Sequence, residues 1–403
     1  MKILHTSDWH LGQKLLFNDR EVEHQLALEW LTQTIIEQEV DALIVAGDIF
    51  DINNPPNYAR RQYYRFLTSL LKTSCRHVVI TGGNHDSPTM LDAPKELLQA
   101  LNMHVVGAVS DQLEDEIIEL KTEAGQLEAV VAAVPFLRDR DLKYSYVGET
   151  GLDRIEALRA GIRNHYKQLG DLVKPYKKKK VPVIAMGHLY AFGATAAEKQ
   201  NNIYIGDVEN IKAKEFPEVF DYVALGHLHR PQSVEMEHIR YSGSLIPLSF
   251  SEVKDDKSVY ILDFNGSQLA HIETVLVPTF RRLKSIQGDL KKVEAALKRF
   301  AEKDNRMLTP WLEIIVETEE VIPQLDLYLK ELTREDDLEI LKIRLQRLNQ
   351  RKELEEEVAD LHTLEVMDVF RKKCQSFGCP PEEMEELERT FIELNSWLEE
   401  KEE

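Results

Sequence analysis

Short continuous apolar runs alternate with amphipathic stretches along the first half of the chain. The runs in KILHTSD, DALIVAGD and HVVITGGNHD each end in a polar or glycine turn. Between them, residues 20–38 and 58–71 carry apolar side chains at helical spacing. Apolar runs bounded by turns predict buried strands, and their alternation with helices predicts an α/β layered core.

The same pattern continues further along the chain. It predicts strands at 104–107, 117–120 and 128–134, then a helix near 153–170 and a basic loop at 177–180. VPVIAMGH and YVALGH are two further strands that end in glycine turns, and two more apolar runs, YSGSLIPLSF and SVYILDF, follow.

Five predicted strands end in residue types that bind metals. Glycine precedes such residues in AGD (46–48), GGNHD (82–86), MGH (186–188) and LGH (225–227), and SDWH (7–10) closes the first strand. Ligand sites in α/β sheets lie beyond the carboxyl ends of the strands. We therefore expect the rim of a single sheet to gather these side chains.

His227 and His229 are two residues apart, so both rings point to the same side of an extended backbone. Alone, such a pair is more often a chance spacing of ordinary histidines than a metal site. The full candidate set exceeds one coordination sphere and suits two ions that share a carboxylate. Its imidazole and carboxylate donors suit Mn, Fe or Zn, and the absence of thiolates argues against a structural zinc. The candidate ligands are Asp8, His10, Asp48, Asn84, His188, His227 and His229.

A second pattern begins near Pro278. FRRLKSIQ, WLEIIVET and LEILKIRLQ predict strands, and the stretches between them predict helices. We interpret residues 278–348 as a small, separate α/β domain and residues 1–277 as the main domain.

Residues 349–403 are predicted to be helical. The last 53 residues hold 17 Asp/Glu and 7 Lys/Arg. Apolar positions there step by three and four, as in a coiled-coil seam: Met384, Leu387, Phe391, Leu394 and Leu398. The seam either docks onto the helices of another chain or packs on its own upstream apolar residues, which are Leu361, Leu364, Met367 and Phe370.

The formal net charge of -20 gives no support for a nucleic-acid partner by itself. Half of it lies in the acidic tail, so a phosphate substrate is not excluded. The cysteines Cys75, Cys374 and Cys379 are an odd and sparse set, which favours a reducing cytoplasm. No signal peptide and no apolar run of about 18 residues is present, so we expect no membrane span.

Taken in order, the motifs D-x-H, G-D, G-N-H-D, G-H and G-H-x-H resemble the calcineurin-like metallophosphoesterase superfamily. The longer segments HTSDWHLG, AGDIFD, GGNHDSP, ALGHLHRPQ and YSGSLIPLSF are similar to the SbcD family of nuclease subunits. The resemblance is close over residues 1–260 and looser over 280–403. It implies a layered metallophosphoesterase β-sandwich flanked by helices, a small α/β capping domain that positions DNA ends, and a helical tail.

The resemblance also implies roles for single residues. The first ion would be held by Asp8, His10, Asp48 and His229. The second would be held by Asp48, Asn84, His188 and His227, with Asp48 bridging. His85 would be the catalytic histidine and Asp86 the carboxylate that orients it. Two Mn²⁺ ions are expected, with Mg, Fe or Zn as substitutes.

By the same resemblance the chain is a manganese-dependent DNA nuclease, a 3′→5′ exonuclease on duplex ends and an endonuclease at hairpins or single strands, in DNA repair, recombination and replication. Its partner would be an SbcC-type coiled-coil ATPase held by residues 349–403. The chain itself has no G-x-x-x-x-G-K-[ST] loop, so ATP must be hydrolysed elsewhere.

The predicted helix 57–72 carries Arg60, Arg61 and Arg65. It could contact a DNA backbone or be a solvated face. The resemblance implies a homodimer through this region, and the homodimer is favoured over DNA contact. Two other functional classes stay open: a stand-alone phosphodiesterase for small nucleotides, and a non-catalytic scaffold between an ATPase and DNA.

Overall fold

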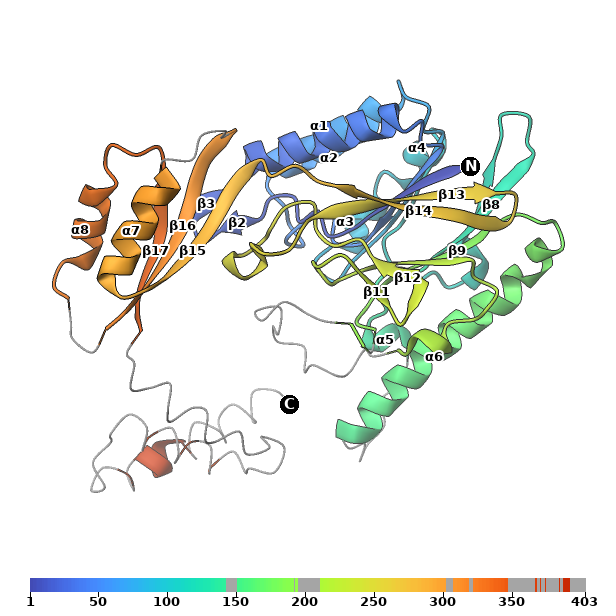
Figure 1. The fold of residues 1–403 in the computed structure, drawn as a ribbon. Helices are drawn as coiled ribbons and strands as arrows, with labels where there is room; N and C mark the ends of the chain where they lie inside the picture. Colours follow the sequence, from blue (N-terminus) through green and yellow to red (C-terminus); the bar gives the residue numbers. More distant parts are fainter. Residues whose placement is uncertain are drawn as a thin grey trace.

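The computed structural model divides into a large unit of two six-stranded sheets and a small α/β unit beside it (Figure 1). The residues that the structure describes are 1–142, 151–191, 193–194, 211–301, 307–318 and 322–346, with 367, 370, 374, 384 and 387–391 in the C-terminal region.

The first sheet has the strand order β14-β13-β1-β4-β5-β6. Strands β1, β4, β5 and β6 run parallel, and β13 and β14 complete the sheet in antiparallel fashion. Their bounds are β1 Lys2–Thr6, β4 Ala42–Ala46, β5 His77–Thr81, β6 Met103–Val106, β13 Ser258–Asn265 and β14 Gln268–Leu276.

The second sheet has the order β11-β12-β10-β9-β8-β7, with β8, β9, β10 and β12 parallel. The bounds are β7 Ile117–Lys121, β8 Leu127–Ala133, β9 Val183–His188, β10 Tyr222–Gly226, β11 Gln232–Val234 and β12 Met236–Tyr241. The expectation that a single sheet carries all five ligand-bearing strand ends is therefore wrong. Strands β1, β4 and β5 belong to one sheet and β9 and β10 to the other. A buried apolar run looks the same in either sheet.

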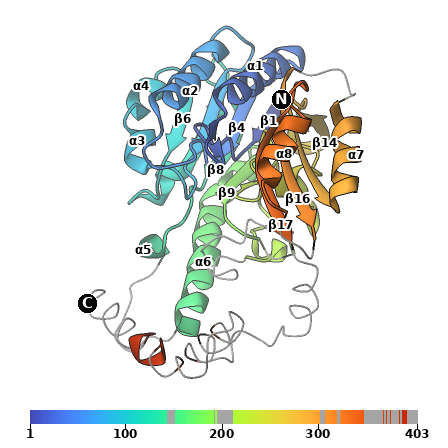
Figure 2. The same cartoon turned by 90° about the vertical axis from the view of Figure 1, so that its left-hand side faces the viewer.

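Helices cover the outer faces of the two sheets (Figures 1 and 2). Helices α1 (Glu21–Glu37) and α2 (Asn57–Leu70) pack on the first sheet, and α6 (Gly151–Lys177) packs on the second. Between the sheets lies a buried apolar layer that includes small and branched side chains, such as Ile44 and Ile184. Strand β4 is buried along its whole length because both of its faces are covered, which explains its continuous apolar run.

Shorter elements complete the large unit. Helix α6 extends beyond the predicted 153–170 and includes Pro175, and the apolar run 241–250 is mostly loop, because β12 ends at Tyr241. The remaining elements are β2 Lys14–Leu15, β3 Asn18–Asp19, α3 Pro88–Asp92, α4 Lys95–Gln99, α5 Asp139–Leu142, and the 3₁₀ turns η1 Leu113–Glu116, η2 Ala213–Glu215 and η3 Phe250–Glu252.

The small unit has the predicted βαβαβ order, and its three strands are parallel. In Figure 2 its helices face the viewer in front of the sheet. Leu312 and Val316 pack there against Val293 and Leu329 of the helices. The bounds are β15 Arg281–Gly288, α7 Leu290–Ala301, β16 Leu308–Glu317, α8 Leu325–Leu332 and β17 Glu339–Gln346.

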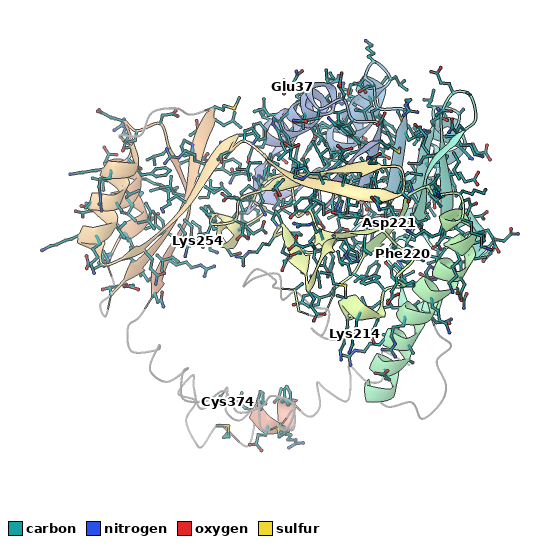
Figure 3. All side chains as sticks on the ribbon, turned by 45° about the vertical axis from the view of Figure 1, so that its right-hand side comes forward. Glu37, Lys214, Phe220, Asp221, Lys254 and Cys374 are labelled. Carbon is teal, nitrogen blue, oxygen red and sulfur yellow. The ribbon has the colours of Figure 1, made fainter. Side chains whose placement is uncertain are left out.

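The two units meet through an apolar contact and an ion pair. Phe250 of the large unit packs with Leu283 and Trp311 of the small unit. Arg281 stacks on the Trp311 ring, and its Nε lies 2.9 Å from Glu23 Oε2. Figure 3 shows Lys254 at this junction.

Few of the predicted tail residues belong to the described set. The Phe370 and Phe391 rings stack with centroids 4.2 Å apart, so Phe391 contacts the upstream segment, as the internal-packing alternative expects. Leu361, Leu364, Leu394, Leu398 and Cys379 lie outside the described residues. Cys75 and Cys374, the second labelled in Figure 3, are both buried. Among the described helices, none is both long and apolar enough to span a membrane.

Candidate metal centre

The loops that follow the strand ends hold the candidate ligands in an unusual backbone conformation. Asp8, His10, Asp48 and His227 have φ values of 51°, 46°, 50° and 100°. Positive φ is costly for residues other than glycine and persists where the surrounding structure enforces it, often at functional sites. The turns after β1, β4 and β10 therefore adopt a strained backbone conformation that places these side chains.

Glycines let the two sheets approach each other at this edge. Gly226 ends β10 in the second sheet and Ala46 ends β4 in the first. A Cβ on Gly226 would lie 1.8 Å from the Ala46 carbonyl oxygen. A Cβ on Gly83 would lie 2.1 Å from Asp48 Oδ1. The glycine in each strand-end motif thus makes room for the neighbouring polar group.

One group of donor atoms comes from Asp8, His10 and His229, which lie within 4.8 Å of one another. The Asp8 carboxylate accepts the His227 N–H at 3.0 Å and the Ser7 hydroxyl at 2.5 Å. His10 Nε2 lies 3.4 Å from Asp48 Oδ2, so Asp48 borders this group.

A second group surrounds the other side of Asp48. His188 Nε2 lies 3.2 Å from Asp48 Oδ2 and 3.0 Å from Asn84 Oδ1. His227 Nδ1 lies 3.1 Å from the same Asn84 oxygen. Burial and the nearby His188 lower the pKa of His227 to about 3, which keeps this imidazole neutral. The structure thus brings all seven candidate ligands together, with Asp48 between the two groups.

The carboxylates create a local negative potential. Burial opposes a charge on His10, but Asp51, Asp48 and Asp8 outweigh it and raise the pKa of His10 to about 9. Asp48 likewise raises the pKa of His188 to about 10 against the effect of burial. Burial also opposes ionisation of Asp48, yet His188 and His10 hold the pKa of Asp48 well below its usual value.

The donor set fits divalent metal ions. His10 Nε2 is buried and has no hydrogen-bond partner among the described residues, although it faces Asp48. The Asn84 amide oxygen faces two imidazole nitrogens. A cation is the group that would use all of these lone pairs at once, and imidazole, amide and carboxylate donors suit borderline metals.

His85 lies at the open side of this centre. Its ring meets the His10 ring edge to face at 4.8 Å, and its Nδ1 donates to the Asp51 carbonyl at 2.7 Å. The contacts of Asp86 differ from the expectation that this carboxylate orients His85. Its carboxylate accepts the backbone N–H groups of Gly83, Ile49 and Phe50, and so joins the loops after β4 and β5. The orienting contact to His85 comes from Asp51.

Sequence reasoning missed two residues beside the ligands. Asp51 Oδ1 lies 3.1 Å from His10 Nδ1, and Glu252 Oε1 lies 3.1 Å from His229 Nδ1. Asp51 had a signal, since it is the second carboxylate of GDIFD. Glu252 had only a weak one, a single acid after the apolar run 241–250.

Comparison with known proteins defines the class first. Residues 1–231 match the calcineurin-like phosphoesterase family, and residues 279–376 match a family described as the type 5 capsule protein repressor C-terminal domain. The fold class expected from the sequence is confirmed.

The particular family follows from individual relatives. The D subunit of the nuclease SbcCD from Escherichia coli K12 is 36% identical over 395 residues, 97% of each chain. The Rhodobacter capsulatus protein of that name is 37% identical over 81% of this chain and 82% of its own. The Bacillus subtilis one is 29% identical over 99% of each. The chain belongs to the SbcD family, and the expected class of hydrolytic nuclease is confirmed.

Proposed function

We propose that this chain is the nuclease subunit of an SbcCD-type complex and cleaves DNA phosphodiesters with two divalent ions, manganese in the first place. The observation that supports this proposal most strongly is that six other donor side chains, from strand ends of two sheets, gather around Asp48. The relatives are named as one component of the nuclease SbcCD, which supports an SbcC-type partner.

We assign Asp8, His10, Asp48 and His229 to the first ion and Asp48, Asn84, His188 and His227 to the second. His10 Nε2 and His188 Nε2 approach the same Asp48 oxygen, which supports the bridging role. When bound, the two ions would lower the pKa of an attacking water and offset the charge that develops on the phosphoryl oxygens.

His85 has the position of a catalytic residue. Its Nδ1 is fixed by the Asp51 carbonyl, so Nε2 is the ring atom left to approach the phosphate. From there it can stabilise the transition state or protonate the leaving sugar oxygen. Asp86 keeps a supporting role in this proposal, because it joins the two loops that carry Asp48 and His85.

The division of labour along the chain is part of the proposal. Residues 1–277 would form the nuclease domain, 278–348 the capping domain that positions a DNA end, and 349–403 the segment that binds the SbcC-type ATPase. The exposed face of α2 forms a shallow groove with Arg60, Arg61, Tyr64 and Arg65. Tyrosine and arginine are enriched at interfaces, which supports a homodimer through this helix.

A labelled hairpin duplex tests the function. With manganese and the partner ATPase, we expect opening of the hairpin and 3′→5′ shortening of duplex ends. His85→Ala should keep both metals, since His85 is not an assigned ligand, and lose about 10²–10⁴-fold in rate. The measurements are gel analysis of the products and metal content per chain.

The alternatives give other results in the same assay. A stand-alone small-nucleotide phosphodiesterase would hydrolyse bis(p-nitrophenyl) phosphate and leave the hairpin intact with or without the partner. A scaffold would cleave neither substrate. Wild-type rates in His85→Ala would remove the catalytic role of that residue.

A further inference from the structure

Each of three proposed histidine ligands has a partner for Nδ1. His188 bonds to the Ala46 carbonyl at 2.9 Å. His10 contacts Asp51, whose side chain is 28% exposed. His229 instead contacts Glu252, whose side chain is 3% exposed. Of these three, His229 is the ring whose Nδ1 contacts a buried carboxylate.

A buried lysine holds that carboxylate and the same histidine. Lys257 Nζ lies 2.7 Å from Glu252 Oε2 and donates to the His229 carbonyl at 2.8 Å and to Ser244 Oγ at 2.9 Å. The Leu248 N–H donates to Glu252 Oε2 at 3.1 Å. Glu252 thus contacts the ring of His229, and Lys257 contacts its backbone carbonyl.

Such a buried pair is weak as a source of stability, since desolvation of two charges offsets their attraction. Its effect on the ring is specific. An ionised carboxylate keeps the imidazole proton on Nδ1 and leaves the Nε2 lone pair for a cation. The donor atoms of Asp8 and His10 lie within 4.8 Å of the donor of His229.

We propose that Glu252 and Lys257 are positioning residues for His229 and set the affinity of the first metal position. The inference rests on the proposed two-metal function and adds two residues to it.

Manganese titration of the metal-free full chain, with free Mn²⁺ followed by electron paramagnetic resonance, tests this inference. Wild type should bind two ions. Glu252→Gln keeps the side-chain size and should weaken one position about 10–100-fold, as loss of a ligand-orienting partner does. Lys257→Met should weaken the same position. The matched control is Lys254→Met, at an exposed position on the same segment, which should leave both unchanged.

If Glu252→Gln and Lys257→Met both bound manganese with wild-type affinity at both positions, the inference would be overturned. So would loss of both ions together with a lower unfolding temperature, because that marks a purely structural role. The wild-type chain offers a test that needs no variant. Nitrogen-15 NMR of the metal-free protein should show His229 protonated on Nδ1. The Nε2–H tautomer would contradict the proposed positioning of the ring by Glu252. A wild type that binds no manganese overturns the proposed function itself.

Discussion

The large and small units each contain a parallel strand that ends in Gly-Asp, yet the two aspartates act differently. After β4, Gly47 leads to Asp48, which is buried between His10 and His188. At the end of β15, Gly288 leads to Asp289, which is exposed and accepts the Lys292 N–H at 2.9 Å at the start of α7. The same dipeptide at the same kind of strand end is a metal-site candidate in one unit and a helix cap in the other.

The difference lies in the surroundings of each strand end. Helix α7 begins directly after Asp289, so the carboxylate is used by the helix N-terminus. A loop follows Asp48, and the ends of β5, β9 and β10 bring an amide and imidazoles to it. The chemistry of such a motif is therefore decided by the neighbouring strand ends, and the fold alone does not specify it.

Replacing each aspartate by asparagine gives the largest expected contrast. Asp48→Asn removes the charge shared by both proposed ions, so we expect the affinity of each metal position to fall by about 100-fold. Loss of a residue that only supports a ligand lowers metal affinity by about 10–100-fold, and loss of the ligand itself should have at least the larger of these effects. Hydrolysis of hairpin DNA should fall with it. Manganese titration and product analysis measure the two effects.

Asp289→Asn is the matched control, because asparagine also caps helices well. It should change neither metal binding nor cleavage. Asp289→Ala should lower the free energy of unfolding by about 1 kcal/mol through the lost cap and still bind both ions. A loss of manganese in either Asp289 variant would contradict the distinction between the two units.

The next-largest effect is expected when the ion pair that joins the two units is removed. Glu23 is 1% exposed and bonds to Arg20 and Arg281. Glu23→Gln leaves two arginines with little exposure beside a neutral amide, at a cost of about 3 kcal/mol. We expect faster hydrogen exchange in β15 while the metal affinity stays the same, measured by mass spectrometry.

Glu37→Gln on the exposed end of the same helix is the control and should leave exchange in β15 unchanged. If Glu23→Gln also weakened manganese binding, the two units would be coupled more tightly than this comparison implies. The apolar contact of Phe250 with Trp311 would be the route to examine, since Glu252 lies in the same 3₁₀ turn.

Much of this architecture could be predicted from the sequence because the strands are buried on both faces. The run ALIVA needs no alternation to mark it, and the glycine and donor residues after it mark the strand end. The division of the ligand strands between two sheets could not be predicted, because apolar runs carry no information on which strand pairs with which.

The partners of the ligands were harder to predict for another reason. Glu252 follows His229 by 23 residues and reaches it only through the loop after β12. The family resemblance implied that Asp86 orients His85. Adjacent side chains in a turn point in different directions, however, and Asp86 bonds to backbone N–H groups. Contacts of this kind depend on tertiary packing.

At the interface between the two sheets we expect a smaller effect than at the Glu23 ion pair, and its dependence on pH has a definite sign. His5 is fully buried there between Tyr222 and Tyr260, and burial lowers its pKa from 6.5 to about 3. The unfolded chain binds the proton first, so the free energy of unfolding is unaffected above pH 6.5 and decreases as the pH falls below it. At pH 5 the loss is about 2 kcal/mol. His5→Phe should remove that part of the pH dependence, seen in urea unfolding of metal-free protein at pH 7 and pH 5. If the difference between the two pH values were unchanged in His5→Phe, His5 would not be the source of that pH dependence, and water would reach this layer in the folded protein.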